Sequence, residues 1–295
     1  MYGGRTVCAL LMFGTSDIEK FRAQHNSVSL IMNIKEKTIQ DFGEQWTAYP
    51  ENEGVYAGLD TLRDLCGPLF DIEKFKGATV ADIGSGSGRI VNMLLEAGAA
   101  RVIAVEPSKA FEVMLENTKA NKDRITYLNI PGDALQETDL DYVVSFGVIH
   151  HIHEPDSTMR AMYSALKSGG QALIWLYGKE GNGLYLFFAR PLRVITKRLP
   201  HKVLHYFAKV LDFFLRLYIK ACKHFKLPMY EYMNNVLAKW TPHIRFVTIY
   251  DQLNPAYAKY YTQAEAVELM SRAGFKNIRL YHRHGYSWTV VGDRE

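Results

Sequence analysis

The chain has 295 residues, of which 48% are hydrophobic, and its formal net charge at pH 7 is +4. This hydrophobic content supports a substantial core, and so small a net charge argues against a chain whose main partner is nucleic acid. Three widely spaced cysteines, Cys8, Cys66 and Cys222, argue against disulfides and zinc and predict a reducing compartment.

The N-terminal segment makes a poor secretory signal. Its apolar run, residues 7–13, is short and is not followed by a clean small-residue cleavage site. We therefore expect a cytoplasmic protein, and residues 1–30 are predicted to form a loose extension.

A glycine-rich turn connects the first predicted strand to a helix. The apolar residues 78–81 precede Asp-Ile-Gly-Ser-Gly-Ser-Gly at 82–88, and an amphipathic helix is predicted over 89–95. Such a turn lays a ligand against exposed backbone N–H groups, and glycine permits both the backbone angles and the close approach. A second apolar run, 101–105, ends in Glu106, which is placed to accept hydrogen bonds from ribose hydroxyls. The residues predict a nucleoside-bearing cofactor.

The spacing of the glycines separates two classes of cofactor site. Dinucleotide folds use Gly-x-Gly-x-x-Gly, whereas here the glycines lie at 84, 86 and 88. This turn resembles the first motif of class I S-adenosylmethionine-dependent methyltransferases. The resemblance implies that the turn passes under the methionine part of the cofactor, that Asp82 orients that part directly or through water, and that Glu106 holds the ribose. The cofactor-binding residues expected near these positions are Asp82, Gly84, Ser85, Gly86, Glu106 and Pro107.

Two later strands extend the resemblance. After a third predicted strand over 125–130, Asp133 would meet the adenine amino group and Ala134 would line the ring, although a simple turn aspartate is the alternative. A fourth strand over 140–148 contains Phe146, also expected at the cofactor, and leads into a histidine-rich segment. The string Phe-Gly-Val-Ile-His-His-Ile at 146–152 resembles the fourth-strand segment of the small-molecule branch of this family, where the substrate and the methyl donor meet.

Three histidines follow that strand. A metal site is not expected, because no Cys or Asp pattern accompanies His150, His151 and His153. Packing or contact with the cofactor is the first interpretation. A general base at His150 or His151 is the alternative, since a neutral imidazole can accept a proton near pH 7.

The remaining elements complete an α/β fold. A helix is predicted over 156–167, ended by a glycine pair, then a strand over 171–178. Near the C-terminus, a helix capped by Thr262 with Glu265 precedes two strands. The resemblance, which covers 78–178 and 262–291, implies a Rossmann-like seven-stranded sheet, mostly parallel with an antiparallel final hairpin, flanked by helices and carrying a helical insertion after strand 5. The predicted divisions are a loose extension (1–30), an N-terminal cover with the cofactor-binding core (31–178), a basic, aromatic helical lid (179–250) and the C-terminal part of the core (251–295).

The insertion combines basic and aromatic residues. Lys202, Lys209, Arg216 and Lys223 recur every seven residues along a helix predicted near 201–226. Three interpretations remain open: a lid whose apolar side covers the site while the basic stripe faces water, a helix lying on the anionic inner face of a membrane, or a stripe that attracts an anionic substrate. Nucleic-acid binding is not expected, because the aromatic side chains are predicted to be buried.

Aromatic residues are also expected around the acceptor. Tyr177, Tyr257 and Tyr261 are candidate substrate contacts, with packing of the lid onto the core as the alternative. Residues 40–50 are predicted to cover the cofactor, as they do in family members.

The resemblance implies an S-adenosylmethionine-dependent methyltransferase that acts by direct displacement on a small-molecule acceptor, which includes a lipid- or glycan-linked one, and leaves S-adenosylhomocysteine. An NAD-dependent oxidoreductase and a non-catalytic S-adenosylmethionine-binding protein are the alternatives.

Overall fold

The computed structural model describes residues 34–52, 54–196, 199–253 and 257–295. The extension predicted over residues 1–30 lies outside these described residues.

A seven-stranded sheet forms the centre of the protein, with the strand order β3-β2-β1-β4-β5-β7-β6. The first five strands pair in parallel, while β7 pairs antiparallel with both β5 and β6. This confirms the predicted fold class. The strands are β1 (Thr79–Ile83), β2 (Arg101–Val105), β3 (Ile125–Leu128), β4 (Leu140–Phe146), β5 (Leu166–Tyr177), β6 (Lys276–Arg283) and β7 (Ser287–Asp293).

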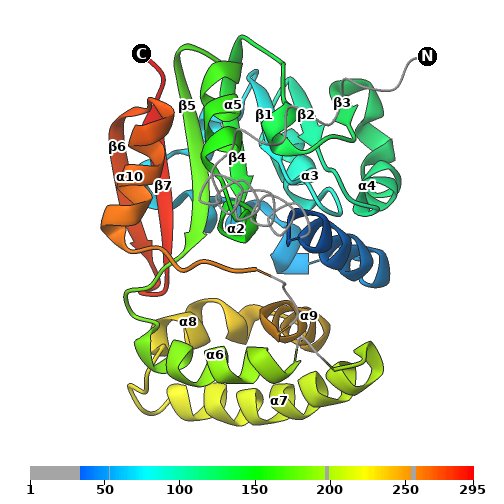
Figure 1. Cartoon of the computed structure of the whole chain (residues 1–295), viewed down its shortest axis with the longest axis vertical. Coiled ribbons are helices and arrows are strands. Elements are labelled where there is room, and N and C mark those ends of the chain that lie inside the picture. The colour runs from blue at the N-terminus through cyan, green and yellow to red at the C-terminus, as the bar shows by residue number, and fades with distance from the viewer. Residues whose placement is uncertain (1–33, 53, 197–198, 254–256) are drawn as a thin grey trace, which may run out of the picture.

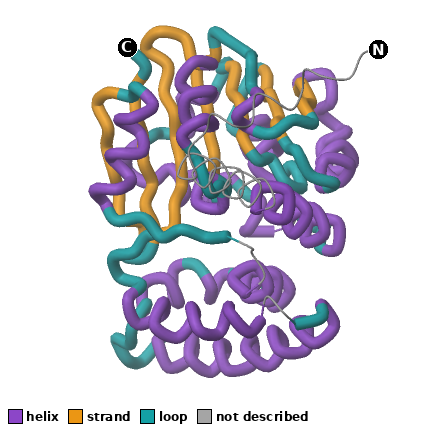
Figure 2. The backbone as a smooth tube through the Cα atoms, in the orientation of Figure 1, coloured by secondary structure: helices purple, strands orange, loops and turns teal. Residues whose placement is uncertain are grey.

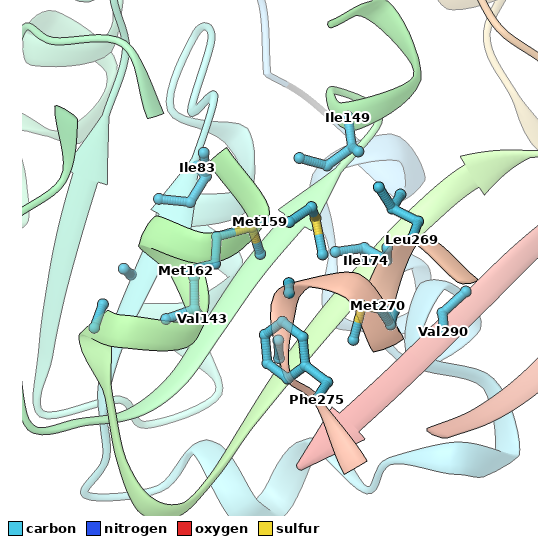
Figure 3. Close-up of a cluster of buried hydrophobic side chains, with 14 of the residues drawn as sticks. Ile83, Val143, Ile149, Met159, Met162, Ile174, Leu269, Met270, Phe275 and Val290 are labelled. Carbon is cyan, nitrogen blue, oxygen red and sulfur yellow. The ribbon is translucent and has the colours of Figure 1, made fainter. Parts of the chain in front are cut away.

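Helices cover both faces of the sheet (Figures 1 and 2). One face packs against α2 (Leu59–Cys66), α3 (Arg89–Glu96) and α4 (Ala110–Thr118), and the other against α5 (Asp156–Ala165) and α10 (Gln263–Ala273). Each face has its own cluster of buried hydrophobic side chains. Because side chains alternate along a strand, Val80 belongs to the cluster on the first face and Ile83 to the cluster on the second face. Figure 3 shows the second cluster, where Met159, Met162 and Met270 fill the space between helices and strands.

The chain begins its fifth strand earlier than the sequence predicts. The helix expected over 156–167 ends at Ala165, and β5 starts at Leu166, which is buried and pairs with Leu140. The intervening residues 167–170 form an irregularity before regular pairing resumes. The burial of Leu166 in the sheet therefore determines where the helix ends, and the glycine pair further along the chain does not.

The helix after the insertion follows its sequence signal. Thr262 accepts a hydrogen bond from the backbone N–H of Glu265, whose carboxylate accepts one from the backbone N–H of Thr262. These two bonds satisfy amides that the first turn of a helix leaves without partners. The predicted capping box is confirmed.

The insertion forms a separate helical layer facing the carboxyl ends of the parallel strands (Figure 1). It consists of α6 (Gly183–Thr196), α7 (His201–Cys222), α8 (Tyr230–Asn235) and α9 (Pro242–Leu253). Two small hydrophobic clusters hold these helices together, one between α7 and α9 and one between α7 and α8. None of the helices in the described part of the chain has the length and apolar character needed to cross a bilayer.

Candidate active site

The glycine turn after β1 requires residues without a side chain. Gly84 and Gly86 have φ angles of 78° and 52°, which other residues rarely adopt. A Cβ on Gly84 would lie 2.5 Å from a methyl group of Val148. The backbone N–H groups of Gly84 and Ser85 donate to the carbonyl of Val105, which ties the turn to β2. The result is a fixed backbone turn beside the end of β2.

Glu106 connects β2 to this turn. Its side chain is buried, and its two oxygens accept hydrogen bonds from the backbone N–H groups of Gly86 at 2.8 Å and Ser108 at 2.9 Å. An ionised carboxylate offers about four acceptor positions, so two remain for a diol. The carboxylate can therefore organise the turn and bind ribose hydroxyls at the same time.

Asp82 lies beneath the turn at the end of β1. It is 1% exposed, its Oδ2 has no hydrogen-bond partner among the described residues, and burial raises its pKa to about 7. A buried acceptor without a partner is unusual and is a feature of sites that await a ligand or water. Asp82 does not line the main cavity, so any effect on a cofactor passes through the turn or through water.

A cavity of about 920 Å³ runs from the turn into the helical insertion. Its volume lies at the upper end of the range typical of small-molecule sites. The predicted site residues that line it are Gly84, Ser85, Gly86, Glu106, Pro107, Asp133, Phe146, His151 and Tyr177. Ala134 and His150 do not.

The helix formed by residues 34–48 covers the cofactor end of this cavity. Phe42 contacts the ring of His151 at a centroid distance of 4.7 Å, and Trp46 lies beside Gly86. Lys35 forms an ion pair of 2.8 Å with Asp133. This helix thus brings Phe42 and Trp46 to the cavity, and its Lys35 reaches Asp133, the carboxylate expected at the adenine.

The two adjacent histidines have different surroundings. His151 lines the cavity, and its Nδ1 lies 2.8 Å from the carbonyl oxygen of Tyr257. Because a carbonyl only accepts, Nδ1 carries the proton and Nε2 is the basic nitrogen of the neutral ring. His150 is fully buried against Tyr177, and burial, with His151 beside it, holds its pKa well below the usual range. The geometry favours His151 over His150 as a proton acceptor.

The three tyrosines expected at the acceptor separate in the structure. Tyr177 lines the main cavity. Tyr261 is 2% exposed and belongs to the core between α5, α10 and the sheet, so the packing alternative applies to it. Tyr257 borders a second hollow beside His153, and it reaches the site only through the carbonyl that holds His151.

A polar cluster that the sequence analysis does not identify lies in the wall of the cavity. Arg193 donates to the Oε1 of Gln252 at 2.7 Å and to the hydroxyl of Tyr260 at 2.8 Å. Gln252 in turn donates to the hydroxyl of Tyr177 at 2.6 Å. The only sequence signal was the presence of two arginines, Arg190 and Arg193, in the otherwise largely apolar α6. Because Tyr177, Gln252 and Tyr260 line the cavity, the cluster can orient a polar group of a ligand.

Comparisons with known proteins agree with this arrangement. Residues 81–174 match a family model described as a methyltransferase domain. The chain is 31% identical over 120 residues to tRNA U34 carboxymethyltransferase of Desulfotalea psychrophila, which covers 38% of this chain and 37% of that protein. It is 32% identical over 108 residues to phosphoethanolamine N-methyltransferase 2 of Caenorhabditis elegans, which covers 35% and 24% respectively. The chain thus spans well under half the length of either relative.

A solved structure also resembles this chain. It is magnesium protoporphyrin IX methyltransferase from Synechocystis PCC 6803 with bound SAH, with a TM-score of 0.47 and 14% identity over 86% of this chain and 84% of that one. The family match covers nearly all of the segment from β1 to β5, which contains the glycine turn and Glu106. The segment that carries the glycine turn and Glu106 therefore matches a methyltransferase domain.

Proposed function

We propose that this protein transfers a methyl group from S-adenosylmethionine to a small, largely apolar acceptor. The observation that carries this proposal is the single cavity that joins the glycine turn to the interior of the helical insertion. The side chains that the helical insertion contributes to its lining are mainly apolar: Leu192, Leu211, Leu215, Met233, Leu237 and Trp240. An apolar acceptor that carries a polar group fits this lining, because the polar cluster around Gln252, together with Arg245 and Thr248, interrupts the apolar side chains.

The residues at the other end fit the cofactor. The turn at Gly84 and Gly86 forms a cradle that a Cβ would obstruct, Glu106 retains acceptor capacity, and Asp133 is placed for the adenine if Lys35 yields its contact. Bound S-adenosylmethionine supplies a methyl group already activated by a positively charged sulfur. The protein therefore has to align the acceptor with that group and exclude water. The helix of residues 34–48 and the helical insertion perform the second task.

We assign His151 as the residue that takes up the proton released by the acceptor. In the tautomer fixed by the carbonyl of Tyr257, Nε2 can accept a proton from a hydroxyl or amine as it is methylated. An amine that is already deprotonated would not need this step.

We expect His151→Asn to lower kcat about a hundredfold, because general-base catalysis contributes roughly 10²–10⁴. Asparagine retains an N–H donor toward Tyr257 but no basic nitrogen. The measurement is transfer of tritiated methyl groups into small molecules extracted from cells, over a range of pH. His224→Asn, on the exposed turn after α7, is the control. Full activity of His151→Asn with an unchanged pH profile would exclude the assignment.

Calorimetric titration of the purified protein tests the proposed cofactor. We expect S-adenosylmethionine and S-adenosylhomocysteine to bind with micromolar affinity, about −8 kcal/mol, and NAD not to bind. Binding of NAD alone would favour the oxidoreductase. Binding of S-adenosylmethionine without transfer to any extract would favour a non-catalytic binding protein.

A tRNA acceptor is the second candidate, favoured by the similarity to a tRNA U34 carboxymethyltransferase. The same tritium assay separates the two candidates when bulk tRNA replaces the small-molecule extract. Label recovered in the tRNA, and none in the extract, would show that the acceptor is a nucleoside of tRNA and not an apolar small molecule.

A further inference from the structure

The outer surface of the helical insertion is unusually apolar. Within the described residues, all twelve large hydrophobic side chains that are exposed lie in α6, in α7 or in the turn that follows α7. They are Leu184, Phe187, Phe188, Val194, Ile195, Val203, Tyr206, Val210, Phe213, Phe214, Leu217 and Phe225. Soluble proteins rarely expose so many large apolar side chains together, and such patches mark interaction surfaces.

Helix α7 carries two separate apolar faces. Its buried face, which includes Leu204, Ala208 and Ile219, packs on α8 and α9. Its exposed apolar residues recur at intervals of three and four, and at 3.6 residues per turn they fall within an arc of roughly 100°. They are Val203, Tyr206, Val210, Phe213, Phe214 and Leu217. The second face is therefore a continuous stripe that no described part of the chain covers.

Positive charge accompanies this stripe. Residues 183–226 contain ten lysines and arginines and one acid, Asp212. That acid is buried and accepts hydrogen bonds from Arg216 at 2.8 Å and Arg245 at 3.4 Å, so its charge is compensated internally. Lys209 and Lys220 are exposed, and the helical period places them at one edge of the apolar stripe. The side chain of Lys202, expected in the basic stripe, lies outside the described residues.

This arrangement corrects two expectations. The apolar residues of α7 do not all face the active site, and Tyr206, Phe213, Phe214 and Phe225 are exposed rather than buried. A stripe of lysines facing water would need no apolar neighbours. An exposed apolar stripe bordered by lysines is the pattern of a helix that lies in the interface of an anionic bilayer.

The cavity extends to this surface. Leu184, Phe188 and Phe214 are 56%, 64% and 60% exposed, and all three also line the cavity. Phe188 lies on α6 and Phe214 on α7, so both helices contribute to the place where the cavity meets the apolar surface. Figure 1 shows these helices at the end of the molecule farthest from the sheet.

We propose that α6 and α7 dock on the surface of an anionic lipid bilayer and that an acceptor dissolved in the bilayer enters the cavity between them. No described helix can span the bilayer, so the contact is peripheral. Docking is independent of the proposed methyl transfer, whereas entry of the acceptor rests on it.

Flotation of the full chain with vesicles tests the docking surface. We expect binding to vesicles of phosphatidylcholine with phosphatidylglycerol, weakened by salt, and weaker binding to phosphatidylcholine alone. Phe213→Asp with Leu217→Asp should lower the partition coefficient at least about tenfold, because two apolar side chains leave the interface. Neither of them lines the cavity, so affinity for S-adenosylmethionine should not change.

Charge reversal measures the electrostatic contribution to vesicle binding separately from the contribution of the apolar side chains. Lys209→Glu with Lys220→Glu should lower binding to the anionic vesicles at least about tenfold and remove its salt dependence. Lys122→Glu with Lys276→Glu, both exposed and outside the helical insertion, is the matched control and should bind like the wild type.

Three results would overturn the proposal. The first is a wild-type protein that binds neither kind of vesicle, and the second is unchanged vesicle binding by the Phe213 and Leu217 variant. The third is a dimer in light scattering that the same variant converts to a monomer while vesicles remain unbound, since a second copy would then occupy the surface. If the Phe213 and Leu217 variant loses vesicle binding but keeps its affinity for S-adenosylmethionine, the result supports docking through this surface and does not bear against the proposed cofactor.

Discussion

Replacement of Glu106 by glutamine should weaken binding of S-adenosylmethionine about a hundredfold. Hydrogen bonds to a charged group contribute roughly 1.5–3 kcal/mol, and in the variant the ribose hydroxyls would no longer donate to a charged carboxylate. The glutamine retains one acceptor oxygen but turns an NH₂ group toward the backbone N–H of Gly86 or Ser108, so the turn itself also loses a partner. Calorimetric titration at constant pH measures the loss.

A control and a comparison variant sharpen this test. Glu112→Gln removes a carboxylate from the exposed first turn of α4 and should leave affinity unchanged. Glu106→Ala leaves two amides without their acceptor, so it should also lower the free energy of unfolding by about 2 kcal/mol or more. Wild-type affinity in Glu106→Gln would show that the carboxylate serves only the turn and does not hold the ribose.

The contact between the glycine turn and Glu106 was predictable from the sequence because local geometry encodes it. A parallel sheet brings the carboxyl ends of neighbouring strands to one edge, so an apolar run followed by Gly84, and a second run followed by Glu106, must meet there. The same holds for the capping box at Thr262, where the partner is three residues away. In both cases the interacting groups have fixed positions within one motif.

The acceptor end was not predictable, because it depends on contacts between segments distant in the chain. Arg193 meets Gln252 across 59 residues and Tyr260 across 67. A helix with two apolar arcs, such as α7, gives no sign in its sequence of which arc faces the core. Tyr261 likewise looked like a neighbour of the cavity, but its β-bridge to Gly178 directs it into the core. Tertiary packing decided each of these cases.

The stability of the protein should depend on the ionisation of Asp82. Its pKa is raised from 3.8 to about 7, mainly by burial, so the folded state favours the neutral carboxyl more than the unfolded chain does. The contribution to stability is therefore present below pH 4 and is lost as the pH rises toward 7. The free energy of unfolding changes by about 1.36 kcal/mol per pH unit for one proton. The difference between the free energies of unfolding of Asp82→Asn and the wild type should therefore rise by roughly 2 kcal/mol in favour of the variant between pH 5 and 7, and then level off.

Urea unfolding of both proteins between pH 5 and 8 measures this difference. Asp123→Asn, which changes an exposed carboxyl, should follow the wild type at every pH. A constant difference between Asp82→Asn and the wild type would mean that Asp82 ionises normally in the folded protein.

The same carboxyl provides a link between folding and cofactor binding. If the ammonium group of the cofactor reaches Asp82 through water, binding stabilises the carboxylate and lowers its pKa. Binding near pH 6.5 should then release protons, which titrations in buffers of different ionisation enthalpy detect, and Asp82→Asn should abolish the release. The unpartnered Oδ2 destabilises the empty protein at neutral pH, and the bound cofactor would remove that cost.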